Sequence, residues 1–172
     1  MDRRPATPEE ARALANPLRL RILRLCLDRA LTNEELAARL GKDAGTVLHH
    51  VRLLVKTGFL APVEERRGPR GSVERPYTAT GKSWTLDVGE AEAGSDRASA
   101  SALALIDAFR AEVAEVPGAW VTETVRMGVR LTPADFERLG ERMKELVEEI
   151  IAADDPDGTP YGLFIGMHRQ PE

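Results

Sequence analysis

The first half of the chain places apolar residues three or four positions apart in four consecutive segments. This spacing lines one face of a helix, so we predict helices over residues 8–16, 18–28, 32–40 and 44–56. Capping residues and glycines at the ends of these segments support the prediction. The N-terminal caps are Thr7, Thr32 and Asp43, the two threonines complete capping boxes with Glu10 and Glu35, and Gly41 and Gly58 follow the last two helices.

The third and fourth predicted helices are joined by a tight turn at Gly41, which is typical of a helix-turn-helix. The fourth helix must turn its apolar stripe inward because the stripe follows the 3.6-residue period. That stripe contains Val47, Leu48, Val51, Leu54 and Val55. The opposite face of this helix is therefore predicted to be exposed.

A hairpin is predicted directly after the fourth helix, because the period of the pattern changes there. Residues 59–63 and 73–80 are typical of strands, with Tyr77 facing the core. The turn between them is rich in glycine, proline and arginine, with Arg66, Arg67 and Arg70. Two strands joined by a basic loop indicate a wing.

The second half of the chain alternates predicted helices and strands. A helix is predicted from Ser99 to Val116, a strand from Val121 to Leu131, a helix from Pro133 to Ala153 and a strand from Tyr161 to His168. The fold class is therefore mainly α with small β: a winged helix-turn-helix domain over residues 1–85 and an α+β C-terminal region over residues 86–172, which we expect to dimerise and to bind an effector.

The charge distribution divides the chain in the same place. The net charge is −4, but residues 1–80 hold 15 Lys and Arg against 10 Asp and Glu, whereas residues 81–172 hold 9 against 18. The first half can approach a polyanion and the second would be repelled by one. No apolar run is long enough for a membrane span or a signal peptide, so we expect a cytoplasmic protein that does not contact membranes. The single cysteine, Cys26, lies on an apolar stripe and is interpreted as a buried small hydrophobe.

These observations predict contacts with double-stranded DNA from the fourth helix and from the wing. The second helix of a helix-turn-helix lies in the major groove, and a basic wing contacts the backbone or the minor groove. His49 and His50 point about 100° apart on a helix, which argues against a shared metal. The candidate DNA-binding residues are Lys42, Ala44, Gly45, Thr46, His49, His50, Arg52, Lys56, Arg66, Arg67 and Arg70.

Three segments resemble the ArsR-type winged-helix regulators: residues 14–23, residues 46–54 followed by Gly58-Phe59-Leu60, and Arg75-Pro76-Tyr77. The resemblance covers about residues 8–85 and implies a homodimer that binds an operator and represses transcription until an effector relieves it. The metal-binding cysteine pair of many members is missing from residues 32–40, and the helix 99–116 has Asp107 but no histidine. We therefore expect no metal, no cofactor and no metal sensing.

An effector, if one binds, is expected to be a small organic molecule held by the C-terminal region. Trp120, Phe136, Met143 and Phe164 could form its apolar wall, although core packing explains the same residues equally simply. We find no catalytic motif and expect no enzyme. The alternative function is a winged-helix protein–protein interaction module, which would expose an apolar patch where this chain has a basic wing.

Overall fold

Four helices form the N-terminal part of the protein, and the predicted N-terminal caps Thr7, Thr32 and Asp43 are all formed, whereas the first two helices end two and three residues earlier than predicted. The computed structural model describes residues 4–68, 71–87, 96–155 and 157–169. The capping boxes at Thr7 and Thr32 are both formed, and Gly41 adopts the left-handed conformation (φ 60°) that ends the third helix. The helices are α1 (Pro8–Leu14), α2 (Pro17–Leu25), α3 (Asn33–Leu40) and α4 (Ala44–Lys56).

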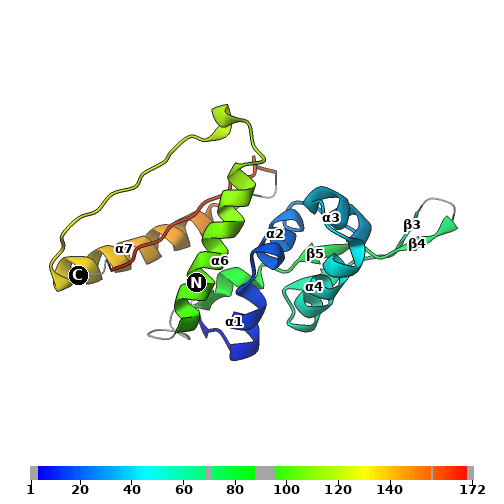
Figure 1. The fold of residues 1–172 in the computed structure, drawn as a ribbon, viewed down its shortest axis with the longest axis horizontal. Helices are drawn as coiled ribbons and strands as arrows, with labels where there is room; N and C mark the ends of the chain where they lie inside the picture. The colour runs from blue at the N-terminus through cyan, green and yellow to red at the C-terminus, as the bar shows by residue number, and fades with distance from the viewer. Residues whose placement is uncertain (1–3, 69–70, 88–95, 156, 170–172) are drawn as a thin grey trace.

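The predicted wing is an antiparallel hairpin in two segments. Near the body, β2 (Leu60–Pro62) pairs with β5 (Tyr77–Ala79), and farther out β3 (Arg66–Arg67) pairs with β4 (Val73–Glu74). Leu31 joins the inner pair through two backbone hydrogen bonds with Tyr77. The outer pair projects away from the helices (Figure 1).

A single apolar cluster holds the N-terminal part together. Val47, Val51 and Leu54 of α4 are fully buried in it, as the stripe predicted, while Val55 packs at its edge and Leu48 is half-buried. Leu86 also belongs to this cluster, and β6 (Leu86–Asp87) pairs in parallel with β1 (Arg4–Pro5). The N-terminal core therefore extends at least one residue beyond the predicted boundary at residue 85.

Helix α6 (Asp96–Val113) packs against α2. Its buried residues are the small Ser101, Ala104 and Ala108, whereas Leu103, Leu105 and Ile106 are exposed. Small side chains allow the two helix backbones to approach closely. At the end of this contact Arg21 of α2 forms an ion pair with Glu115, so a basic helix faces an acidic segment.

The two strands predicted for the C-terminal region are wrong. Residues 121–131 and 161–168 run without regular secondary structure, one before and one after α7 (Pro133–Ala152) (Figure 1). The alternation of apolar and polar residues can define the two faces of a strand, but a strand also needs a neighbouring strand for its backbone hydrogen bonds. No such neighbour lies among the described residues of this single chain, so the described part of residues 96–169 is helical rather than α+β. The short 3₁₀ helix η3 (Gly118–Trp120) precedes the first of these segments.

The sequence predicted that no segment is apolar enough over a sufficient length to span a membrane. Among the described residues, none of the helices is both long enough and apolar enough to cross a bilayer.

Candidate nucleic-acid interface

The first turn of α4 is organised by the carboxylate of Asp43. It accepts hydrogen bonds from the backbone N–H of Gly45 and Thr46 and from the Thr46 hydroxyl, each at 3.0 Å. The bonds from Gly45 and Thr46 hold the pKa of Asp43 below its usual value. Because the Thr46 hydroxyl donates to Asp43, its oxygen remains available as an acceptor for a base amino group.

The face of α4 opposite the core stripe is exposed, as the sequence predicted. Ala44 and Gly45 have small side chains, which allow the helix end to approach a groove closely. His49 is exposed beside them, whereas His50 is half-buried on the flank of the helix. The exposed candidates on or next to α4 are Lys42, Ala44, Gly45, Thr46, His49, Arg52 and Lys56.

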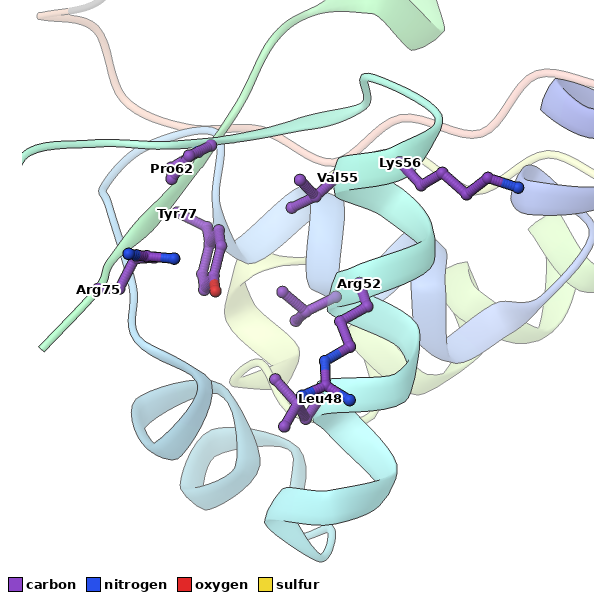
Figure 2. A pocket seen from close by; sticks show the side chains of 8 residues that line it. Leu48, Arg52, Val55, Lys56, Pro62, Arg75 and Tyr77 are labelled. Carbon is purple, nitrogen blue, oxygen red and sulfur yellow. The ribbon is translucent and has the colours of Figure 1, made fainter.

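Lys56 is directed away from this face. Its Nζ forms an ion pair with Glu9 of α1 at 2.8 Å, and its side chain extends away from the wing in Figure 2. Lys56 therefore links α4 to α1 in this structure. Arg52, by contrast, forms no ion pair with any described residue, so its positive charge on the exposed face of α4 is unpaired within the described part of the chain.

The arginines of the wing differ in their surroundings. The guanidinium of Arg66 donates to Glu74 at 2.8 Å and to Glu35 of α3 at 2.7 Å, which anchors the wing to the helix-turn-helix. Arg67 is exposed and has no ion-pair partner within the described part of the chain. Arg70 lies outside the described residues. Arg67 is thus better placed than Arg66 to meet a phosphate.

An open hollow of about 420 Å³ lies between α4 and the wing (Figure 2). Its apolar floor and cationic border make it suitable for an anionic group that approaches along the protein surface. Arg75 borders this hollow opposite Arg52 and was not among the candidate residues predicted from the sequence. Its Nη2 forms an ion pair with Oε1 of Glu65 at 2.6 Å, which orients the guanidinium. The only signal for Arg75 was its place in the wing segment that resembles a known family. The lining residues are Leu48, Val51, Arg52, Val55, Lys56, Pro62, Arg75 and Tyr77.

The four residues proposed to bind an effector do not form an enclosed wall in this chain. The side chain of Trp120 is 71% exposed, and those of Phe136 and Phe164 are 43% and 41% exposed. Phe164 instead packs on Phe109 of α6, with ring centroids 5.8 Å apart, and Met143 is half-buried on α7. Effector binding at these residues stays a prediction. Within the described ranges, His, Cys, Asp and Glu side chains form no group of three or more that could hold a metal.

Comparison with known proteins identifies the part of the chain that carries this interface. Residues 14–63, from the end of α1 to the start of the wing, match the family model described as a helix-turn-helix domain. This segment is a helix-turn-helix domain. The match bears out the helix-turn-helix that the sequence predicted in this part of the chain.

Among solved structures, part of this chain is similar to reduced HlyU from Vibrio cholerae N16961. The two chains are 29% identical, the match covers 40% of this chain and 65% of HlyU, and the TM-score is 0.34. The chain therefore spans less than two thirds of the length of this relative. No curated protein matches the chain.

Proposed function

We propose that this protein is a sequence-specific DNA-binding transcription regulator, in which α4 reads bases and the wing binds the backbone. The observation that carries the proposal is the exposed polar face of α4, next to a cationic wing and within a segment that matches a helix-turn-helix domain. The alternative, a protein–protein interaction module, would require an apolar patch at this place. The exposed face of α4 carries His49, Thr46 and Arg52 instead.

The two elements should make different contributions to binding. Base contacts discriminate between sequences, by about 1–3 kcal/mol for each good contact. Phosphate contacts add affinity for any sequence and release counterions, by roughly 0.9 units of log–log salt slope per phosphate. Thr46→Ala or His49→Ala should therefore weaken operator binding by roughly ten- to a hundredfold, with a smaller effect on random DNA. The triple replacement of Arg66, Arg67 and Arg70 by Ala should weaken both and flatten the salt dependence.

These expectations can be measured after an operator has been selected from a random duplex pool. Fluorescence anisotropy on operator and scrambled duplexes across salt concentrations gives affinity and slope for each variant. A selection without enrichment, together with unchanged DNA affinity in all variants, would refute DNA reading and favour an interaction module.

Arg66 and Arg67 provide a matched comparison within the wing. Arg67→Gln should remove a phosphate contact and reduce the salt slope by roughly one unit. Arg66→Gln should change the slope less, because Glu35 and Glu74 already neutralise that guanidinium. Equal slopes for the two variants would contradict this assignment.

We also propose that the protein binds its operator as a homodimer through its C-terminal region, because operators are read as paired half-sites by two-fold dimers. The face of α6 that points away from α2 exposes Leu103 (60%) and Ile106 (43%). The segment 121–131 exposes Val125 (73%) and Met127 (71%). Large exposed apolar surfaces of this kind mark interaction sites.

Sedimentation velocity of the full chain tests the dimer. Val125→Glu should give a monomer because it places a charge in the proposed apolar contact, while Thr124→Glu, which adds the same charge at the neighbouring polar residue, should leave a dimer. A wild-type monomer at micromolar concentration would refute dimerisation, and a Val125→Glu dimer would place the contact elsewhere.

We further propose that the protein represses transcription and that an organic effector, rather than a metal, relieves this repression. The family resemblance supports repression, and the missing cysteine pair supports an effector other than a metal. A reporter gene behind the selected operator should be more active when the protein is absent. Tight zinc binding to the dimer, measured by calorimetry, would refute the non-metal part.

A further inference from the structure

Arg19 is a buried cation near the start of α2. It lies in the first turn of α2 and is only 9% exposed. Its Nε donates to the carbonyl oxygen of Ala13 at 2.5 Å, and its Nη2 donates to that of Arg12 at 2.6 Å. Both carbonyls belong to the last turn of α1, where backbone oxygens lack partners within the helix. Arg19 therefore caps α1 from the side and joins it to α2.

The remaining guanidinium nitrogen of Arg19 reaches the DNA-reading helix. Its Nη1 lies 3.4 Å from Nδ1 of His50, which is half-buried on the flank of α4. A guanidinium has only hydrogen-bond donors, so Nδ1 of His50 must be the acceptor and carry no proton. In a neutral imidazole the proton then resides on Nε2.

The surroundings of His50 favour this neutral ring. Burial lowers its pKa first, and the charges of Arg19 on α2 and His49 on α4 lower it further. The rings of the two histidines contact edge to face, with centroids 5.6 Å apart, so His49 also restricts the orientation of His50.

We propose that Arg19 is a positioning residue that fixes His50 as the Nε2–H tautomer, so that α4 presents one oriented donor to a phosphate oxygen at the edge of the groove. His50 is about 100° around α4 from His49, on the flank toward α2 rather than toward the wing. A donor there meets the DNA backbone, while His49 faces the bases. The DNA contact rests on the proposed function, but the tautomer does not.

Nuclear magnetic resonance of the full-length protein without DNA tests the tautomer. In long-range proton–nitrogen spectra of histidine-labelled protein at pH 8, His50 should show a protonated Nε2 and an unprotonated Nδ1. The His50→Gln variant, which lacks the His50 signals, identifies them among those of the three histidines. In Arg19→Met, which removes the donors at similar length, His50 should shift to a mixture of tautomers. If His50 carries its proton on Nδ1 in the wild-type protein, the proposal is overturned. This outcome does not depend on whether any variant folds.

Two substitutions of His50 test the DNA contact separately. The amide nitrogen of glutamine lies close to the position of Nε2, and that of asparagine lies close to Nδ1. His50→Gln should therefore keep affinity for DNA within about twofold, whereas His50→Asn should lose roughly tenfold. Equal affinities for the two variants would overturn the contact. If the wild type binds no DNA, the proposed function fails while the tautomer measurement stands.

Discussion

Glu10 offers the sharpest test of how the N-terminal domain is held together, through the substitution Glu10→Gln. This carboxylate is buried, with the residue 7% exposed, and it joins three parts of the chain. Arg4 donates to both of its oxygens at 2.7 and 2.9 Å, Lys82 lies 2.8 Å away, and the backbone N–H of Thr7 donates at 2.8 Å. Glutamine keeps one acceptor but loses the charge and the second acceptor.

The magnitude follows from these contacts. A hydrogen bond to a charged group contributes about 1.5–3 kcal/mol, but Arg4 is half exposed and its share is screened by solvent. We expect Glu10→Gln to lower the free energy of unfolding by about 2 kcal/mol. For a protein of this size the melting temperature should fall by on the order of 4–8 °C.

The pH dependence gives a second, independent measure. Hydrogen bonds from Arg4, followed by Lys82 and Thr7, hold the pKa of Glu10 well below its usual range in the folded state. The stabilisation is therefore present above the pKa of the unfolded state, about 4.3, and is lost as the pH falls. The stability difference between wild type and Glu10→Gln should narrow by roughly 1 kcal/mol between pH 5.5 and 3.5.

Thermal and urea unfolding at several pH values measure both effects, and Glu9→Gln is the control. Glu9 is adjacent in sequence, but it is exposed and its pair with Lys56 lies at the surface, so its replacement should change stability little. If Glu10→Gln unfolds like Glu9→Gln and shows no narrowing at low pH, the carboxylate does not hold these segments together.

Other predictions concern local geometry and reactivity. Gly41→Ala should destabilise the protein by about 1 kcal/mol in urea unfolding, because only glycine adopts a φ of 60° without strain, and Gly41→Asn should cost less. Burial raises the pKa of the Cys26 thiol to about 12, so iodoacetamide should modify it only after denaturation, and rapid labelling of the native protein would contradict its burial. Glu9→Gln should release Lys56 toward DNA and steepen the salt dependence of binding, and an unchanged slope would mean that Lys56 stays clear of the backbone.

The sequence predicts the local structure correctly where neighbouring residues determine it, as in the helix caps. A capping box such as Thr32 with Glu35 is closed within one turn, and a left-handed glycine such as Gly41 ends a helix through its own backbone. The stripe of α4 also predicted which residues are exposed, because burying Val47, Val51 and Leu54 fixes the opposite face. The candidate interface on α4 follows from this local information.

The tertiary structure decided what depends on residues far apart in the chain. Lys56 was a predicted DNA-binding residue, but α1 brings Glu9 beside it and pairs its charge. Arg19 is buried because the end of α1 presents two carbonyl groups to its guanidinium. Which side of α6 is buried also depends on the tertiary structure, because its small residues Ala104 and Ala108 are the ones that pack on α2. The alternation of apolar and polar residues in 121–131 predicts an apolar face but does not provide a neighbouring strand. A strand forms only where a second segment completes its backbone hydrogen bonds. The sequence by itself determined the helices, most of their caps and the exposed face of α4, because these depend on contacts within a few residues. Only the tertiary structure determined which charges are paired and which segments find a partner.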